Sequence, residues 1–268
     1  MLTQRTGIGS EIRARVGSGI GRAGVAARQA ANRVLRVVFP PQCLTCDATV
    51  GEDGALCASC WGDTPFVAGL VCDKCGIPLP GQDEGVTVLC DDCHHIARPW
   101  GRGRAVLMYG DKARRIVLGI KYYDRHDTIG PAGRWLARAA APMLRADTLV
   151  APVPLHRWRL FRRRYNQSAQ LSAALARASG TDHCPDLLIR PRHTGSQDGR
   201  SRTARFENLA GAIIAHPRRA ALMAGRHVLL VDDVLTSGAT LAAATGACFA
   251  EGADAVDVVV LARVGHRE

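Results

Sequence analysis

Two adjacent carboxylates and a loop of small hydroxyl residues form the segment of this sequence best suited to chemistry. Four apolar residues, 228–231, have the continuous hydrophobic pattern of a buried parallel strand, and Asp232 and Asp233 follow directly. Residues 236–240 read Thr-Ser-Gly-Ala-Thr and open an alanine-rich segment typical of a helix. Ligands of open α/β sheets bind beyond the carboxyl ends of the strands, and helix N-termini attract anions. The segment therefore predicts a phosphate site beside two acids that suit the hydroxyls of a ribose or a hydrated Mg²⁺.

This segment closely resembles the phosphoribosyl pyrophosphate (PRPP) motif of the type I phosphoribosyltransferases. The resemblance implies that Asp232 and Asp233 contact the ribose 2′- and 3′-hydroxyls and serve catalysis. An ordinary strand–turn–helix with a Thr or Ser cap is the alternative, but it does not require two acids before the loop. The resemblance further implies that the 5′-phosphate is held by Thr236, Ser237, Gly238, Ala239 and Thr240.

Ten cysteines form a second group of residues that could do chemistry. Eight of them form four Cys-x2-Cys pairs, and Cys184 and Cys248 are left over. Such pairs are typical of structural Zn²⁺ sites, in which two pairs complete a tetrahedron of thiolates. Disulfides would imply export, but residues 1–40 lack the apolar core of a secretory signal, so we expect up to two zinc ions and a cytoplasmic location. The expected ligands are Cys43, Cys46, Cys57, Cys60, Cys72, Cys75, Cys90 and Cys93.

The composition narrows the class of protein. The 268 residues are 47% hydrophobic, enough for one core and a smaller module, and no run approaches the ~20 apolar residues of a membrane span. Lys and Arg number 35 against 24 Asp and Glu, which gives a formal charge of +11. A balance this basic favours partners that carry phosphate, namely nucleotides, PRPP or nucleic acid.

Three regions are expected along the chain. Residues 1–39 are a basic extension whose glycines disfavour a helix, apart from a short one near 25–38; the first 24 residues are disordered or precede the true start. Residues 40–98 are a zinc-binding double knuckle whose stability depends on metal. Sequential pairing of its Cys-x2-Cys turns gives two Cys₄ sites, and a cross-braced arrangement stays open. Residues 99–268 are the phosphoribosyltransferase-like domain.

The third region alternates between strand and helix patterns. Such alternation predicts an α/β fold, with a mainly parallel twisted sheet flanked by helices. The expected strands are 105–109, 148–152, 187–189, 212–215, 227–231 and 256–261, and the expected helices are 112–120, 130–143, 167–178 and 238–250.

Several further residues are candidates for binding pyrophosphate or nucleic acid. One expected strand of this chain ends near Pro152 and Val153. In type I phosphoribosyltransferases the loop at the corresponding place binds pyrophosphate, so the resemblance implies this role here. A run of arginines at 157–164 is interleaved with aromatic residues, which suits phosphate and stacked bases, although a solvated loop is the alternative. Lys121 could face the pyrophosphate or be an exposed lysine at a helix end. The remaining candidates are Arg162, Arg163, Arg164 and Arg205, the last in a segment that resembles a phosphate-closing loop.

The order of motifs resembles the ComF family, phosphoribosyltransferase-like proteins associated with DNA uptake in naturally competent bacteria. The matching stretches are Pro40-Pro41-x-Cys43, the knuckles, Ile120-Lys121-Tyr122, Val153-Pro154-Leu155-His156, Arg164-Tyr165-Asn166-Gln167, Gln197, Arg205 with Asn208, and the PRPP motif. Members of that family often carry one Cys₄ knuckle, whereas this chain has two. It also has Arg164 where the family has a glycine, and arginine is less free to take a positive φ.

The resemblance implies a PRPP-binding protein that uses Mg²⁺. As an enzyme it would be a pentosyl transferase that transfers phosphoribosyl to an acceptor, which the sequence does not identify, and releases pyrophosphate. If the acceptor is a nucleobase nitrogen, the protein needs to supply no general base. The alternative is a non-catalytic module on the same fold that binds single-stranded DNA, or a partner such as a helicase or recombination factor.

Overall fold

The computed structural model describes residues 39–122, 126–155, 166–191, 209 and 211–265. The basic extension predicted for residues 1–39 lies outside these ranges, apart from Phe39. Among the residues described, no helix is both long and apolar enough to cross a membrane.

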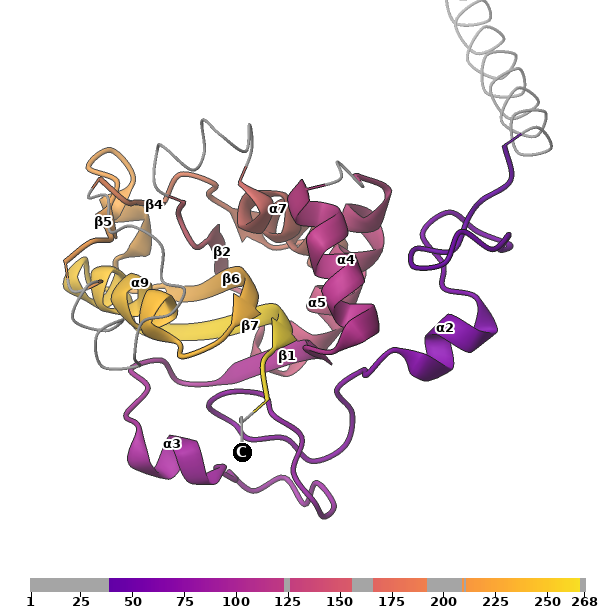
Figure 1. The fold of residues 1–268 in the computed structure, drawn as a ribbon. Helices are drawn as coiled ribbons and strands as arrows, with labels where there is room; N and C mark the ends of the chain where they lie inside the picture. Colours follow the sequence, from indigo (N-terminus) through magenta and orange to yellow (C-terminus); the bar gives the residue numbers. More distant parts are fainter. Residues whose placement is uncertain (1–38, 123–125, 156–165, 192–208, 210, 266–268) are drawn as a thin grey trace, which may run out of the picture.

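A five-stranded sheet forms the centre of the molecule (Figure 1). Neighbouring strands are parallel throughout, as the sequence predicts for this α/β fold. Their order across the sheet is β1 (Gly103–Met108), β7 (Ala255–Arg263), β6 (His227–Leu235), β2 (Leu149–Pro152) and β3 (Asp182–His183).

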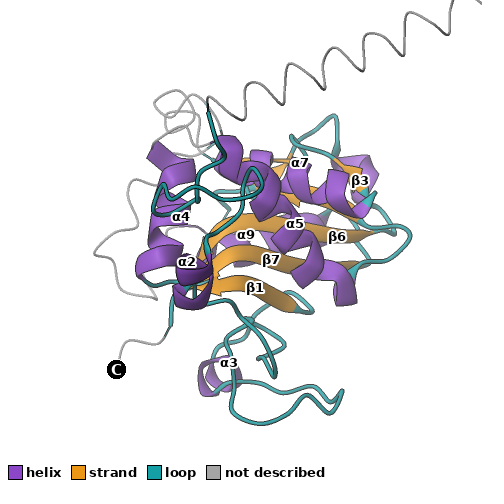
Figure 2. Ribbon diagram, turned by 90° about the vertical axis from the view of Figure 1, so that its right-hand side faces the viewer, coloured by secondary structure: helices purple, strands orange, loops and turns teal. Residues whose placement is uncertain are grey.

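Helices cover both faces of the sheet (Figures 1 and 2). One face is covered by α4 (Asp111–Tyr122), α5 (Ile129–Ala140) and α7 (Gln167–Ser179), and the other by α9 (Ala239–Ala250). Parallel strands joined through helices bury both faces of a sheet, so their sequences are apolar at nearly every position. The described 3₁₀ turns lie at His126–Thr128, Ala141–Met143 and Ala220–Met223.

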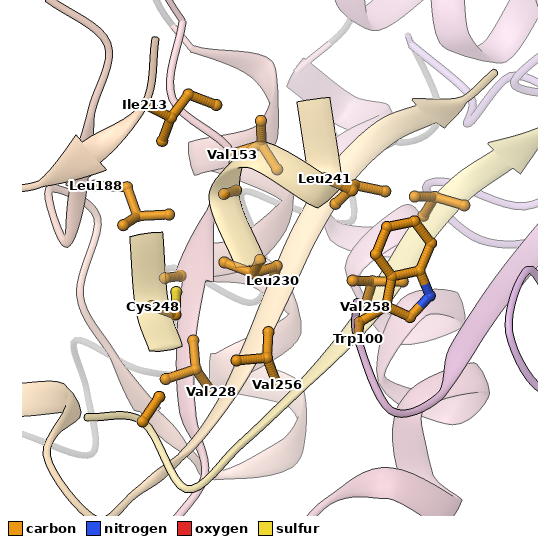
Figure 3. Packing of buried hydrophobic residues seen from close by; sticks show 14 of the residues in the cluster. Trp100, Val153, Leu188, Ile213, Val228, Leu230, Leu241, Cys248, Val256 and Val258 are labelled. Atoms are coloured by element: carbon orange, nitrogen blue, oxygen red, sulfur yellow. The ribbon is translucent and has the colours of Figure 1, made fainter. Parts of the chain in front are cut away.

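The apolar run of β6 supplies both halves of the core. Val228 and Leu230 pack in the cluster on the α9 side, and Leu229 and Val231 pack with α4, α5 and α7. Successive side chains of a strand point to opposite faces, so four consecutive apolar residues fill both layers. Figure 3 shows Val228 and Leu230 beside Val256 and other side chains of the first cluster.

Three predicted strands differ from the structure in their end or in their placement. The predicted strand 227–231 continues to Leu235, because β7 pairs with β6 as far as Leu235 and Arg263, whereas β2 stops at Pro152 opposite Val231. Asp232 and Asp233 therefore lie inside β6 and not after its end. The predicted strands 187–189 and 212–215 form a separate antiparallel pair, β4 (Leu188–Ile189) with β5 (Ile214–Ala215).

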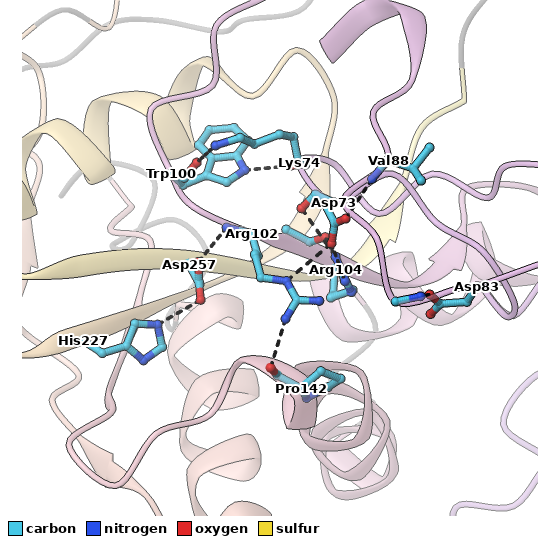
Figure 4. Close-up of polar contacts among 12 residues, drawn as sticks. Asp73, Lys74, Asp83, Val88, Trp100, Arg102, Arg104, Pro142, His227 and Asp257 are labelled. Carbon is cyan, nitrogen blue, oxygen red and sulfur yellow. Dashed lines mark hydrogen bonds and ion pairs between the residues drawn. The ribbon is translucent and has the colours of Figure 1, made fainter. Parts of the chain in front are cut away.

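The opposite ends of the same strands are closed by a buried polar network (Figure 4). His227 Nε2 lies 3.1 Å from Asp257 Oδ2, and His227 Nδ1 lies 2.9 Å from Thr148 Oγ1. The backbone N–H of Arg102 donates to Asp257 Oδ1 at 2.6 Å. Burial raises the pKa of Asp257, but the hydrogen bonds from His227 and Arg102 outweigh it, and the net shift is downward. Buried hydrogen bonds therefore hold the strands together at this end of the sheet.

The cysteine-rich segment packs against the edge strand β1. It contains the short helices α2 (Ala58–Asp63) and α3 (Asp91–His95). The backbone N–H of Gly103 donates to the carbonyl of Asp73 at 2.6 Å, and Arg104 forms an ion pair with the Asp73 carboxylate at 2.7 Å (Figure 4). Gly76 has a φ of +68°, and a Cβ there would lie 2.6 Å from the backbone N of Ala105. Glycine is therefore required where this turn meets β1.

Candidate functional site

The connections of the sheet reverse between β2 and β6. β2 continues through α7 to β3, which lies on its outer side, whereas β6 continues through α9 to β7 on the other side. The two strands are neighbours, so their carboxyl ends diverge into helices on opposite faces. Such a switch point is where ligands of open α/β sheets bind.

Asp232 lies at this switch point and is held by the start of α7. Ser168 Oγ donates to Asp232 Oδ1 at 2.8 Å, and the N–H of Asp233 donates to the same oxygen at 2.9 Å. Asn166 caps α7 by accepting from the N–H of Ser168 at 3.1 Å, and its Nδ2 donates to the carbonyl of Val153 at 3.2 Å. The cap therefore ties together the ends of both strands and the acid.

The neighbouring acid, Asp233, has a cation as its partner. Lys121 Nζ, in the last turn of α4, lies 2.7 Å from Asp233 Oδ2, and the two side chains are 19% and 17% exposed. The sequence left two placements open for Lys121, one facing the pyrophosphate and one exposed at the helix end. The structure does not show an exposed lysine. It brings the ammonium to the acid pair.

The environment of Asp232 favours its neutral form. Burial and the charge of Asp233 raise the pKa of Asp232 to about 7, although Ser168, the N–H of Asp233 and Lys121 oppose the shift. The Asp232 carboxyl therefore titrates close to neutrality.

The loop between β6 and α9 is fixed by two buried arginines. Arg263 Nη1 donates to the carbonyls of Leu235 and Thr236 at 3.3 and 3.1 Å, and Arg98 Nη1 donates to the carbonyl of Ser237 at 3.3 Å. Gly238 follows with a φ of +85°, and α9 begins at the next residue. The amides of the first turn of α9 thus lie in the segment that the sequence predicts to hold phosphate.

The structure brings together part of the predicted site. The acids, the loop 236–240 and Lys121 lie around the carboxyl end of β6, and Val153 lies beside it, with its N–H donating to the carbonyl of Val231 at 2.9 Å. Pro152 is the last residue of β2. Four predicted residues lie outside the described ranges: Arg162, Arg163, Arg164 and Arg205.

Sequence reasoning missed the residues that support the site. Asn166 and Ser168 could have been found, because Asn before a helix followed by small polar residues is an N-cap pattern. Arg98 and Arg263 carry no such signal. They lie far from the loop in sequence and reach it only through tertiary packing.

The eight paired cysteines form two clusters. In each cluster four Sγ atoms lie within 4.8 Å of one another. All ten cysteines are free, and the close pairs Cys46–Cys57 and Cys75–Cys90 have Sγ atoms 3.6 and 3.7 Å apart, far beyond a disulfide bond. The pairing is sequential and not cross-braced, with Cys43, Cys46, Cys57 and Cys60 in one cluster and Cys72, Cys75, Cys90 and Cys93 in the other.

The donor sets of both clusters fit a structural zinc ion. Four thiolates are the ligands of closed tetrahedral Zn²⁺ sites, and such a site carries a net negative charge. Each cluster has a cation at its side. Lys112 Nζ lies 3.4 Å from Cys60 Sγ, and Arg98 Nε lies 3.0 Å from Cys93 Sγ. The two Cys₄ sites are consistent with two structural zinc ions.

Comparison with protein families matches both parts of the chain. Residues 34–94 match a double zinc ribbon domain, and residues 169–268 match a phosphoribosyl transferase domain. With the sheet topology, these matches define a protein of the type I phosphoribosyltransferase fold that carries N-terminal zinc ribbons.

Comparison with characterised proteins narrows the class. The chain is 30% identical to DNA utilization protein YhgH of Escherichia coli K12 over 199 residues, which cover 72% of this chain and 84% of that one. It is 27% identical over 210 residues to competence protein F of Haemophilus influenzae, covering 76% and 88%. It is 25% identical over 218 residues to competence protein ComFC of Bacillus subtilis, covering 74% and 85%. The chain therefore belongs to the same family as these proteins, the ComF family.

Solved structures are more distant. The glutamine PRPP amidotransferase from B. subtilis, complexed with ADP and GMP, superposes with a TM-score of 0.37 and 20% identity, covering 54% of this chain and 30% of that one. This similarity is too weak to carry an argument about activity.

Proposed function

We propose that the protein binds PRPP at the switch point between β2 and β6 and takes part in DNA uptake or utilization. The observation that carries this proposal is the acid pair. Asp232 and Asp233 lie inside β6, one held by Ser168 and one by Lys121, directly before a loop whose carbonyls are fixed by arginines. Such an arrangement suits a ribose diol beside a phosphate ester.

Each part of the site has a proposed role. Asp232 and Asp233 accept hydrogen bonds from the ribose 2′- and 3′-hydroxyls. Residues 236–240 hold the 5′-phosphate through backbone amides and hydroxyls, with the positive end of α9 behind them. Pro152 and Val153 form the floor on which the pyrophosphate lies, because they end the strand beside β6.

Lys121 has a double role in this proposal. In the structure its ammonium forms an ion pair with Asp233. A bound diol donates to that carboxylate in its place, and the ammonium lies where it can then attract the pyrophosphate. Mg²⁺, when bound with PRPP, would neutralise pyrophosphate charge, and the carboxylate oxygens of the acid pair are hard donors that fit this ion.

Transfer of phosphoribosyl to an acceptor would follow from the same geometry. The diol contacts fix the ribose, and cations around the pyrophosphate stabilise the charge that develops as it leaves. We propose Arg162, Arg163, Arg164 and Arg205 as further pyrophosphate or nucleic-acid contacts.

A second candidate function is binding of single-stranded DNA or of a helicase or recombination partner without turnover. The printed names of the relatives, which concern DNA utilization and competence, and the formal charge of +11 favour it. In either case eight thiolates must stay reduced, which a cytoplasmic location provides.

Calorimetry with PRPP and Mg²⁺ tests the first function. The double variant Asp232→Asn and Asp233→Asn should abolish binding, while Asp254→Asn, an exposed acid whose carboxylate lies beside Arg145, should bind like the wild type. Pyrophosphate release with candidate acceptors then separates transfer from binding. Unchanged affinity in the double variant would exclude this site.

A titration with single-stranded DNA tests the second function. Binding should weaken steeply with salt, and Arg162→Ala with Arg163→Ala should reduce it. Salt-insensitive binding, or the same affinity in the arginine variant, would count against DNA recognition by this run.

A further inference from the structure

We infer that Arg98 is a positioning residue through which the second cysteine cluster, Cys72 to Cys93, fixes the phosphate loop. The zinc ribbon would then be a part of the ligand site and not only a separate stabilising module. The inference rests on the proposed PRPP function for its ligand, but the contacts that carry it are independent of that ligand.

Arg98 contacts the cluster and the loop with different atoms of one guanidinium. Its Nε donates to Cys93 Sγ at 3.0 Å, and its Nη1 donates to the carbonyl of Ser237 at 3.3 Å. The residue is 7% exposed, so both hydrogen bonds are largely shielded from water. A single rigid, planar group thus joins a metal ligand to the loop.

The remaining surface of Arg98 is also tied to the cluster. Its guanidinium carbon lies 5.3 Å from the centre of the Trp100 ring, a cation–π distance. Trp100 Nε1 donates to the carbonyl of Lys74 at 2.6 Å, and Lys74 Nζ donates back to the carbonyl of Trp100 (Figure 4). Lys74 lies between the first two cysteines of the cluster. The knuckle therefore holds both the arginine and the ring beneath it.

The loop is closely fitted to this pair. A Cβ added at Gly238 would lie 2.4 Å from Arg98 Nη1 and 3.0 Å from the Trp100 ring, and the φ of Gly238 is +85°. The last turn before α9 thus takes its left-handed conformation in contact with Arg98. A shift of the guanidinium would change the space that this turn occupies.

Only one of the two loop arginines depends on the cysteines. Arg263 donates to the carbonyls of Leu235 and Thr236 from the end of β7, so we expect it to stay in place when the cluster is changed. Arg98 holds the next carbonyl, at Ser237, which directly precedes the glycine. The first cluster has a cation of its own, Lys112, which lies on α4 and provides a matched control.

The zinc ion would set the position of Arg98 through charge. As one of four thiolates that would hold Zn²⁺, the Cys93 sulfur would be fixed and negatively charged, so its hydrogen bond from Nε would be charge-assisted on both sides. Loss of the ion from this cluster would free the sulfur and with it the arginine. The carbonyl of Ser237 would then lose its donor, and the amides of residues 236–240 would lose their fixed direction.

The test compares Arg98→Lys with Lys112→Gln in the full chain. Lysine keeps the charge but cannot donate in two directions from one plane. We expect Arg98→Lys to weaken PRPP binding about tenfold, the loss typical of one hydrogen bond from a charged donor, and to speed amide exchange of residues 236–240 without ligand. Zinc content should stay at the wild-type level. Lys112→Gln should change neither affinity nor exchange of the loop.

The exchange measurement keeps the two proposals distinguishable. If the wild type does not bind PRPP, the proposed function fails, whereas faster loop exchange in Arg98→Lys still supports the coupling. Loop exchange equal to the wild type in folded Arg98→Lys overturns the coupling, whatever the affinity. In a second arm, Cys93→Ser should speed exchange of the loop and Cys46→Ser should not. Equal exchange in these two variants would also overturn it; should Cys93→Ser not fold, the arginine variant decides.

Discussion

Lys121 Nζ lies 2.7 Å from Asp233 Oδ2, and this ion pair joins the last turn of α4 to the acid pair inside β6. The contact explains how two consecutive acids can share one strand. Asp232 titrates near neutrality, and the positive charge of Lys121 offsets the negative charge of its neighbour. The site is thus electrically balanced before any ligand arrives, and the balance must change when a diol or a phosphate enters.

Replacing Lys121 tests this balance. Lys121→Ala leaves Asp233 without its cation beside a second acid, so we expect the free energy of unfolding at pH 8 to fall by about 1 kcal/mol, since the pair is partly shielded from water. Urea denaturation measures the change. In a double-mutant cycle with Asp233→Asn the two effects should not add. Additive effects would show that the pair contributes nothing to stability.

The pKa of Asp232 predicts a pH dependence of stability. It is about 7 in the folded protein, against an ordinary value of 3.8, so the folded state binds the extra proton. The contribution of this proton to the stability of the folded state is fully present below pH 3.8 and is lost as the pH rises through 7. Asp232→Asn keeps the neutral form, so it should be more stable than the wild type by about 1–2 kcal/mol at pH 8, and by less than half of that difference at pH 5. Denaturation at both pH values checks this.

The same carboxyl predicts that ligand binding releases a proton. A ribose diol needs Asp232 as an acceptor, so PRPP affinity should rise with pH, by up to about tenfold per unit below pH 7, and level off above it. Calorimetry in two buffers of different ionisation enthalpy detects the proton.

Ser168→Ala provides the control for this pH profile. It removes a hydrogen bond that lowers the pKa of Asp232 and should move the midpoint of the profile to higher pH. A midpoint that stays in place or moves down would contradict the assignment of the profile to Asp232.

The contact between the second knuckle and β1 predicts a costly glycine substitution. Gly76→Ala places a Cβ against the backbone of Ala105 at a φ of +68°, so we expect a loss of about 2 kcal/mol or more. Gly51→Ala is the matched control in the first knuckle, where a Cβ would meet nothing within 4 Å. The melting temperatures of both variants test this prediction. Equal melting temperatures would show that the turn at Gly76 does not pack tightly against β1.

Removal of zinc should affect the two clusters unequally. The four cysteines of the second cluster belong to the same buried core as Val228 and Leu230 of β6, whereas Cys46 of the first cluster is exposed. A chelator should therefore first remove one ion with little loss of the sheet's circular dichroism, and loss of the second should unfold the sheet in the same step. Release of both ions with the sheet intact would argue that the second cluster is not a core element.

The sequence predicted the parts of the site that follow one another along the chain. Asp232, Asp233 and the loop to Thr240 lie in one segment, and their strand-to-helix pattern is local. The end of β6 was misjudged because the strand continues on the side of β7 after β2 has stopped. That asymmetry depends on which strands are neighbours, and a strand's own sequence does not record its neighbours.

The contacts that hold the site together were not predictable in the same way. Arg98 reaches Ser237, and Arg263 reaches Thr236, only after the sheet has formed. Cysteine spacing indicated metal sites but left their pairing open, because sequential and cross-braced arrangements use the same turns. The predicted strands 187–189 and 212–215 have ordinary apolar patterns, and nothing local distinguishes a strand of a small separate pair from one of the main sheet.

The position of β7 has a consequence for how the chain reaches its native state. β1 begins at Gly103, but its partner in the sheet, β7, begins only at Ala255 and lies between β1 and β6. During synthesis β1 must wait for most of the remaining chain to emerge before its ladder can close, and closing so long a loop slows folding. The cysteine-rich segment hydrogen-bonds the opposite edge of β1, so only the edge that faces β7 must wait unpaired for the end of the chain.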